Sequence, residues 1–144
     1  MRKIRTIGEC DLGAIAEIEK LCFFDPWSEK SLELLLRDGN FGITAEEDGK
    51  VVAYVGVISA PPEGEITNVA THPDFRRRGI GAELLEFLKE EAKTRGIDSL
   101  YLEVRRSNSA ARNLYEKSGF EVVGERKGFY KNPKEDAILM GWSN

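Results

Sequence analysis

Residues that bind metal ions are scarce in this chain. It has one histidine, His72, and two cysteines, Cys10 and Cys22, with no Cys-x-x-Cys pair. A structural zinc site needs several ligands of these kinds, so we expect no metal. Two cysteines cannot form the disulfide framework of a small secreted domain, and reduced thiols are typical of the cytoplasm. A histidine-dependent catalytic triad has only His72 available, and the position of His72 beside Pro73 favours a loop role.

Long apolar runs and an excess of positive charge are also missing. No stretch approaches the ~18 consecutive apolar residues of a membrane span, and residues 1–6 lack the apolar core of a signal peptide. The net charge of −4 and the pI near 5.2 argue against general binding of nucleic acid. We therefore expect a cytoplasmic protein without membrane or nucleic-acid partners. Its 144 residues, of which 41% are hydrophobic, are expected to form a single domain over residues 1–144.

The most informative stretch that is present reads RRRGIGA at residues 76–82, and we call it the arginine turn. It joins an expected strand, Glu65–Thr71, to an expected helix, Ile80–Arg95. Backbone N–H groups at the start of a helix lie at the positive end of its dipole and can hold a phosphate without a metal. Glycines in such a turn let the backbone approach a ligand closely. The turn matches neither a Walker loop nor the Gly-x-Gly-x-x-Gly pattern, and an ordinary helix start with exposed arginines is the alternative.

Hydrophobic periodicity along the chain predicts elements in the order β-α-α-β-β-β-α-β-α-β-β. Asp48-Gly49 predicts a tight hairpin between the second and third strands. This pattern indicates an α/β fold with strands of mixed direction. The expected strands are Lys3–Ile7, Phe41–Glu46, Val51–Ser59, Glu65–Thr71, Ser99–Val104, Glu121–Lys127 and Asp136–Trp142. Of the four expected helices, the first is capped by Asp11 and breaks at residues 23–27, the second is capped by Ser28 and ends at Asp38-Gly39, the third covers Ile80–Arg95, and the fourth is capped by Ser107 or Asn108 and ends at Ser118.

Two residues are candidates for acid–base chemistry. The strand period of two places Glu103 and Arg105 on the face opposite the apolar residues of Ser99–Val104. A carboxylate near the C-terminal edge of an inner strand can act as a general base, and Glu103 equally fits an ion pair with Arg105 or Arg106. Tyr115 lies in the following helix, where it fits either a core position or a proton donor to a leaving thiolate.

These features together resemble the GNAT superfamily of N-acetyltransferases. The acetyl-CoA signature of that superfamily, Arg/Gln-x-x-Gly-x-Gly/Ala, is matched by Arg76, Gly79 and Gly81, after a strand that matches at Thr67–Thr71 and a His72-Pro73 entry. The resemblance implies the GNAT fold, a central, mixed, mostly antiparallel twisted sheet flanked by helices. It also implies that acetyl-CoA is the co-substrate.

A narrower resemblance, to the RimI-type ribosomal-protein-alanine N-acetyltransferases, covers nearly the whole chain. It is carried by the segments FDPWSE at 24–29, LEVRRSN at 102–108, LYEKSGF at 114–120 and RKGFY at 126–130. The chain departs from the RimI-type pattern at Phe129, where a second tyrosine is frequent, and at Asp25, which changes the aromatic-Pro-Trp spacing.

The resemblance implies transfer of acetyl to the α-amine of a protein N-terminus, with a ribosomal protein that begins with alanine as partner, by a monomer or weak dimer. Glu103 would be the base and Tyr115 the acid. The cofactor-binding residues would be Val69, Ala70, Thr71, Arg76, Arg77, Arg78, Gly79, Ile80, Gly81, Ala82 and Asn108. The acceptor entrance would be shaped by Phe23, Trp27 and Tyr130. Two alternatives remain: an acetyltransferase for lysine or small amines, and a non-catalytic acetyl-CoA-binding regulatory module.

Overall fold

The computed structural model describes all residues from Met1 to Asn144 and contains one seven-stranded sheet in the order β1-β2-β3-β4-β5-β7-β6. Every neighbouring pair of strands is antiparallel except β4 and β5, which are parallel. The predicted α/β fold with its mixed, mostly antiparallel sheet is confirmed. The strands are β1 (Arg2–Thr6), β2 (Phe41–Glu47), β3 (Lys50–Ala60), β4 (Glu63–Thr71), β5 (Ser99–Arg105), β6 (Glu121–Lys131) and β7 (Lys134–Ser143).

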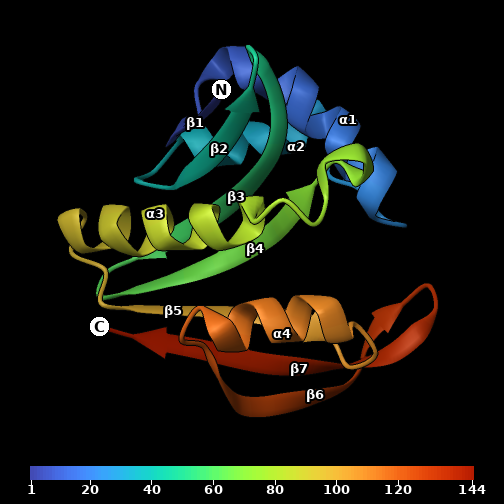
Figure 1. Cartoon of the computed structure of the whole chain (residues 1–144). Helices are drawn as coiled ribbons and strands as arrows, with labels where there is room; N and C mark the ends of the chain where they lie inside the picture. Colours follow the sequence, from blue (N-terminus) through green and yellow to red (C-terminus); the bar gives the residue numbers. More distant parts are fainter.

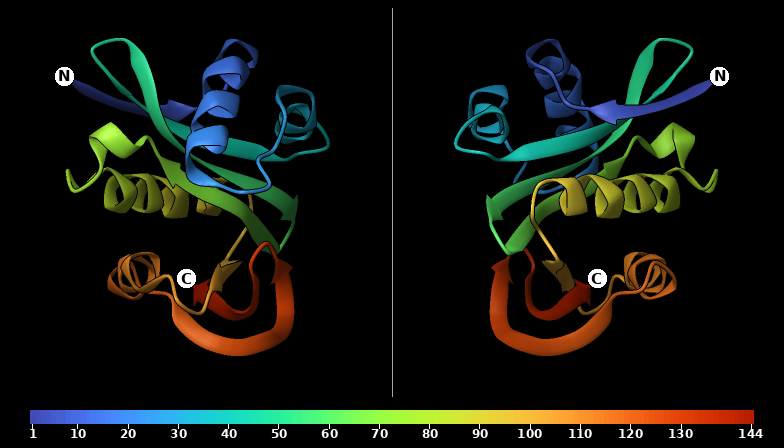
Figure 2. Two further views of the ribbon diagram at one scale, coloured as in Figure 1. Left: turned by 90° about the vertical axis from the view of Figure 1, so that its right-hand side faces the viewer. Right: turned by 90° about the vertical axis from the view of Figure 1, so that its left-hand side faces the viewer.

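Helices cover both faces of the sheet (Figures 1 and 2). α1 and α2 lie on one face, and α3 and α4 lie on the other. The helices are α1 (Leu12–Cys22), α2 (Glu29–Leu32), α3 (Ile80–Thr94) and α4 (Ser109–Lys117), and short 3₁₀ segments occupy Glu9–Asp11, Glu33–Leu36 and Pro73–Phe75. The predicted element order is therefore confirmed.

Each face buries its own apolar cluster. The larger cluster packs α3 and part of α4 against the sheet, with Leu84, Leu85 and Leu88 fully buried. The smaller cluster packs α1 against β3 and β4 and includes Leu12 and Ile15. In both helices the buried residues recur at helical spacing, so each helix presents one apolar side to the sheet.

Several local predictions differ from the structure. Asp11 does not cap α1 with its side chain; its carboxylate accepts from Gly8 N and from Arg5, because a 3₁₀ turn precedes the helix. β4 begins at Glu63 rather than Glu65. β6 continues past Lys127 because its pairing with β7 resumes beyond a bulge.

Three other local predictions are confirmed. Asp48 and Gly49 form the hairpin turn. The Ser28 side chain caps α2 by accepting from Ser31 N, and the Asn108 side chain caps α4 by accepting from Ala111 N. The remaining predicted bounds agree within a few residues, except that the second helix is a short α turn followed by a 3₁₀ turn.

The parallel pair β4–β5 opens soon after it forms. The two strands pair only where Glu63–Glu65 faces Ser99–Tyr101, and they diverge from there toward the other end of the sheet (Figure 1). β5 stays paired with β7 along its full length. The β5-facing edge of β4 beyond Glu65 therefore has no strand partner.

A bulge in β4 lies at the same opening. Val55 pairs with Val69 and Val57 with Ile66, so Gly56 alone faces two residues of β4. A Cβ at Gly56 would lie 2.6 Å from Thr67 Oγ1, so only glycine fits opposite this bulge. Bulges of this kind bend a strand and increase its twist.

No helix in the structure is long and apolar enough to span a bilayer. No group of three or more His, Cys, Asp or Glu side chains is arranged to bind a metal ion.

Candidate active site

A pocket of about 470 Å³ occupies the opening between β4 and β5, and we call it the central pocket. Its walls come from β4, β5, the start of α4, the segment that follows α1, and the β6–β7 hairpin. Residues far apart in the sequence therefore meet at the one place where the sheet is split. The sequence-predicted site residues that line it are Phe23, Trp27, Val69, Glu103, Asn108, Tyr115 and Tyr130.

Glu103 lies on β5 with its side chain only 15% exposed. Burial raises the pKa of Glu103, Arg126 opposes that shift as a nearby cation, and Glu65 adds to it. The Arg126 Nε–Glu103 Oε2 distance is 3.2 Å. Arg105 and Arg106, the partners considered from the sequence, pair instead with Glu135 and Glu125. A carboxylate whose pKa lies above the ordinary glutamate value is better suited to accept a proton near neutral pH.

Tyr115 projects from α4 and is buried except where it meets the central pocket. Burial raises the pKa of Tyr115, with a smaller contribution from Tyr130. Its ring packs against Phe120 at a centroid distance of 6.0 Å. The phenol therefore stays protonated at neutral pH and can act only as a proton donor there.

The β6–β7 hairpin is held against the end of β5 by Arg105. The Arg105 guanidinium donates to the carbonyl oxygens of Pro133, at 2.8 Å, and Asn132, at 3.1 Å. It also lies 4.3 Å from the centroid of the Tyr130 ring. Burial is the main cause that raises the pKa of Tyr130, to about 12. These contacts fix Tyr130 on one side of the central pocket.

Another part of the pocket wall is formed by residues 23–28, which we call the acceptor loop after the role that the family resemblance implies for Phe23 and Trp27. Phe23 and Trp27 are half-buried, whereas Phe24 is 74% exposed. All three line the central pocket together with Asp25. The loop therefore places an aromatic surface at the mouth of the cavity.

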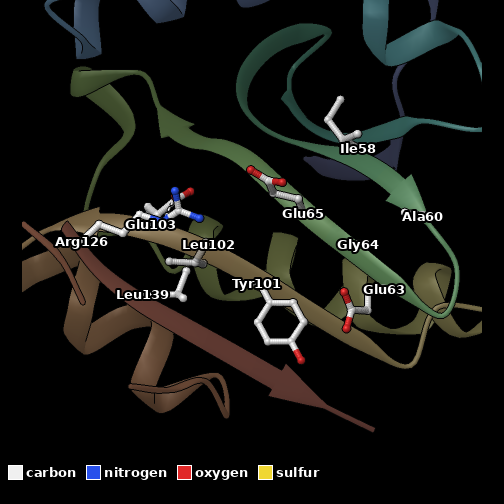
Figure 3. Close-up of a pocket in the computed structure, with 10 residues that line it drawn as sticks. All are labelled: Ile58, Ala60, Glu63, Gly64, Glu65, Tyr101, Leu102, Glu103, Arg126 and Leu139. Atoms are coloured by element: carbon white, nitrogen blue, oxygen red, sulfur yellow. Dashed lines mark ion pairs between the residues drawn. The ribbon is translucent and has the colours of Figure 1, made fainter. Parts of the chain in front are cut away.

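A shallower groove of about 370 Å³ lies beside Glu103 between β4 and β5 (Figure 3). Glu63 and Glu65 enter it from β4, and Tyr101 and Glu103 enter it from β5. Arg126 is the one cation in its lining. We call this feature the acidic groove. Leu102 and Glu103 line both cavities, so the groove adjoins the central pocket.

The arginine turn lies outside the central pocket, at the end of β4. Arg77 and Gly79 both adopt left-handed backbone angles, with φ of 64° and 75°. None of the backbone N–H groups from residue 77 to residue 82 donates a turn, loop or side-chain hydrogen bond, and the first helical bond of this region runs from Glu83 N to Gly79 O. Consecutive free N–H groups at a helix start form an anion-binding concavity.

The arginines and glycines of this turn have distinct surroundings. Arg76 donates to Thr71 O and to Cys22 Sγ, and the Arg78 carbonyl accepts from Arg2 at 3.1 Å. Arg77 makes no ion pair. A Cβ at Gly79 would meet nothing within 4 Å, whereas one at Gly81 would lie 2.9 Å from Leu114 Cδ2. Gly81 thus permits close packing of α3 against α4, a reason that the sequence pattern did not indicate.

Ala70 and Thr71 lie next to the pocket without lining it. Ala70 faces α1 and is buried beside Tyr54 in the smaller cluster. The Thr71 carbonyl accepts from the Cys22 thiol at 3.3 Å and from Arg76. His72 accepts from Asp74 N and caps the 3₁₀ turn, which confirms its loop role.

Sequence reasoning missed three residues around the site: Glu19, Asn68 and Arg126. Glu19 had a detectable signal, because it falls on the buried stripe of α1 where a charged residue is unexpected. The sequence carries no such signal for Asn68 or Arg126. Asn68 lies in the β4 bulge and Arg126 pairs with Glu103 across strands, and both features depend on strand register.

Comparisons with known proteins identify the family and the fold. Residues 12–120 match the sequence model of the acetyltransferase (GNAT) family. A [ribosomal protein bS18]-alanine N-acetyltransferase from Salmonella typhimurium is 37% identical over 97% of this chain and 96% of its own length. The crystal structure of the ribosomal-protein-S18-alanine N-acetyltransferase from Escherichia coli superposes with a TM-score of 0.91 at 35% identity, covering 99% of this chain and 94% of that one.

A more distant structure shows the same fold with ligand. It is a putative acetyltransferase from Salmonella typhimurium with its cofactor acetyl-CoA, at a TM-score of 0.80 and 23% identity over 99% of this chain and 93% of that one. The co-substrate of the present enzyme is acetyl-CoA. The fold, the family match and relatives that span nearly its whole length show that this chain belongs to the acetyltransferase (GNAT) family, within its RimI-type branch of N-acetyltransferases.

Proposed function

We propose that this enzyme transfers acetyl from acetyl-CoA to the α-amine of a ribosomal protein that begins with alanine. The observation that carries the proposal is that Glu103 and Tyr115 line one pocket, at the opening between β4 and β5. The names of relatives that match over nearly the whole chain support the same acceptor.

The residues around the opening fit acetyl-CoA. The free N–H groups of the arginine turn, with three exposed arginines beside them, suit a pyrophosphate. The unpaired edge of β4 at Val69–Thr71 suits a pantetheine arm that binds as an added strand. Asn108 caps α4 with its side-chain oxygen, which leaves its amide nitrogen free to donate into the pocket.

The acid–base pair then has defined roles. Glu103 accepts a proton from the acceptor amine, directly or through one water, so that the nitrogen lone pair attacks the thioester carbonyl. The carbon–sulfur bond breaks as the carbon–nitrogen bond forms. Tyr115 donates its proton to the departing sulfur, and acetylated amine and CoA leave as products. The presence of both groups argues against a non-catalytic binding module.

An α-amine suits this site better than a lysine side chain. Only the neutral amine attacks, and an α-amine with a pKa near ~7.8 has roughly 400-fold more neutral form at pH 7 than a lysine near ~10.4. That difference is worth about 3.5 kcal/mol. Glu103 is the one carboxylate that the strands contribute to the pocket, and a single base is sufficient for the more acidic ammonium; the other lining carboxylate, Asp25, is exposed in the acceptor loop.

The acidic groove supports a basic acceptor. Glu63, Glu65 and Glu103 face one arginine there, so the local field attracts a cationic peptide segment (Figure 3). A ribosomal protein, which must bind RNA, carries such segments.

Paired peptides of one sequence test the acceptor. One peptide has a free alanine N-terminus and a blocked lysine, and the other has a blocked N-terminus and a free lysine. We expect kcat/KM at pH 7 to be at least about tenfold higher for the free N-terminus, because its amine has roughly 400-fold more neutral form than the lysine amine. Faster acetylation of the lysine peptide would show that the enzyme prefers lysine acceptors. Acetylation of neither peptide would indicate a non-catalytic acetyl-CoA-binding module.

A further inference from the structure

A carboxylate with no cationic partner lies buried behind the central pocket. Glu19 of α1 is 0% exposed. None of the ion pairs in the structure includes it, whereas the largely buried Asp11, Glu46 and Glu135 each pair with an arginine. Burying an ionised group costs several kcal/mol unless hydrogen bonds replace its lost water. Glu19 therefore needs a specific set of donors.

Three donors from three segments surround this carboxylate. Trp27 N donates to Oε1 at 2.9 Å. Oε2 accepts from the Tyr54 hydroxyl at 2.5 Å and from Asn68 Nδ2 at 2.9 Å. Burial and the Glu19 charge together raise the pKa of Tyr54, so the phenol remains a donor. Hydrogen bonds to a charged acceptor are among the stronger ones in proteins.

Two of these donors belong to different walls of the central pocket. Trp27 is in the acceptor loop, and Asn68 is one of the two bulged residues of β4. The acceptor loop has no regular secondary structure between α1 and α2, so it lacks its own backbone ladder. The two oxygens of one side chain thus join the aromatic mouth of the pocket to the strand that carries its acetyl-CoA edge.

We propose that Glu19 is a positioning residue that fixes the acceptor loop relative to the β4 bulge and so sets the affinity for the acceptor peptide. The proposal rests on the proposed function for the identity of the acceptor. Glu19 does not line the pocket and does not contact the reacting atoms.

Glu19→Gln is the direct test, because it keeps the shape of the side chain and removes one acceptor oxygen. A glutamine oxygen turned toward Tyr54 and Asn68 leaves an NH₂ group facing Trp27 N–H, two donors against each other. A glutamine oxygen turned toward Trp27 leaves the same conflict at Asn68. With the oxygen toward Trp27 that conflict is relieved only if the Asn68 amide turns over, so the variant either loses one of these bonds or rebuilds the contact at the β4 bulge.

Tyr54→Phe is the matched control. It removes the third donor, and Tyr54 does not line the central pocket. The bonds to Trp27 and Asn68 remain. We expect this variant to melt at a lower temperature while its KM for the acceptor peptide stays within twofold of the wild type.

Trp27 also provides a readout that does not depend on activity. Trp142, on β7, is the second tryptophan of the chain and lies outside the pocket. In a Trp142→Phe background, acrylamide quenching of fluorescence reports the mobility of Trp27 alone. We expect Glu19→Gln to raise the quenching constant at least twofold and the acceptor KM about tenfold, with kcat at saturating peptide changed less than threefold.

Unchanged quenching and acceptor KM in folded Glu19→Gln would overturn the proposal, as would equal effects from Tyr54→Phe. If Glu19→Gln does not fold, Glu19→Asp, which retracts the carboxylate, is measured with the same expected and overturning results. Failure of the wild type to acetylate any N-terminal peptide would overturn the proposed function alone, because the quenching comparison would still decide whether Glu19 holds the acceptor loop.

Discussion

The two sides of the central pocket are built in different ways. The side that we assign to acetyl-CoA is one continuous segment, in which β4 leads through the arginine turn into α3. The acceptor side combines the acceptor loop with the β6–β7 hairpin, about a hundred residues later in the chain. Backbone geometry organises the first side: left-handed residues at 77 and 79 and free N–H groups at a helix start.

Long-range side-chain contacts organise the second side. Glu19 holds the acceptor loop through Trp27 N, and Arg105 holds the hairpin through two carbonyl oxygens. We therefore expect the proposed acetyl-CoA side to tolerate changes in side chains better than changes in backbone conformation. The acceptor side should show the reverse, since removing a single anchor releases a whole loop.

Glu103→Gln tests the residue that lies between the two sides and should have the largest effect. We expect kcat to fall on the order of 10²- to 10⁴-fold, because the base is removed, while the acetyl-CoA Kd changes less than about twofold. Steady-state kinetics and calorimetry measure the two quantities. Glu65→Gln, in the same acidic groove, is the control and should keep kcat. Near-normal kcat in Glu103→Gln from about pH 6 to 9 would show that Glu103 is not the base and serves only as the ion-pair partner of Arg126.

Stability gives the same variant a second signature. The raised pKa of Glu103 means that folding disfavours its charged form, so this residue costs stability once the pH exceeds the ordinary value of 4.5. Glu103→Gln should therefore unfold in urea at pH 7 with an equal or larger free energy than the wild type, and the gain should vanish below pH 4.5.

Tyr115→Phe should also lower kcat while the protein stays folded. No hydrogen bond within the protein contributes to the pKa shift of the Tyr115 hydroxyl, so its removal should cost little stability.

Glycine substitutions in the arginine turn sharpen the comparison on the acetyl-CoA side. Gly79→Ala must adopt a left-handed angle that costs about 1–2 kcal/mol for other residues, so we expect acetyl-CoA affinity to fall roughly tenfold. The acceptor KM should not change. Gly81→Ala should act through Leu114 instead, and Gly81→Ala combined with Leu114→Ala should recover affinity. Calorimetry measures each variant, and an unaffected Gly79→Ala protein would exclude the phosphate role of the turn.

Arg126→Gln should have the smallest effect, a shift in pH dependence. Arg126 lowers the pKa of Glu103 against the larger effect of burial, so its loss should raise that pKa further. The acidic limb of the kcat/KM profile then moves to higher pH, by less than about one unit, because Arg126 is exposed and its field is screened. Arg106→Gln removes an exposed arginine that pairs with Glu125 and should leave the limb in place. An unmoved limb in Arg126→Gln would mean that another group sets it.

The parts of the site that the sequence revealed are local ones. Gly79 and the three arginines beside it could be proposed from the sequence because phosphate binding at a helix start needs only neighbouring residues. The alternation along β5 was equally readable, and it placed Glu103 on the face opposite Leu102. The local predictions that failed were the side-chain cap at Asp11, the start of β4 at Glu65, the regular second helix and the end of β6 at Lys127. An extra 3₁₀ turn precedes α1, and a bulge interrupts the β6–β7 pairing.

The pairing of residues distant in the chain could not be read in this way. The periodicities of 2 and 3.6 reflect burial of one face of each element, so the sequence alone predicted the elements, their order and the arginine turn. It did not contain the registers that open β4 from β5, give Glu103 the cation Arg126, and bring Trp27 and Asn68 to the buried Glu19. Those contacts join segments tens of residues apart, and their geometry exists only once both apolar clusters have packed against the sheet.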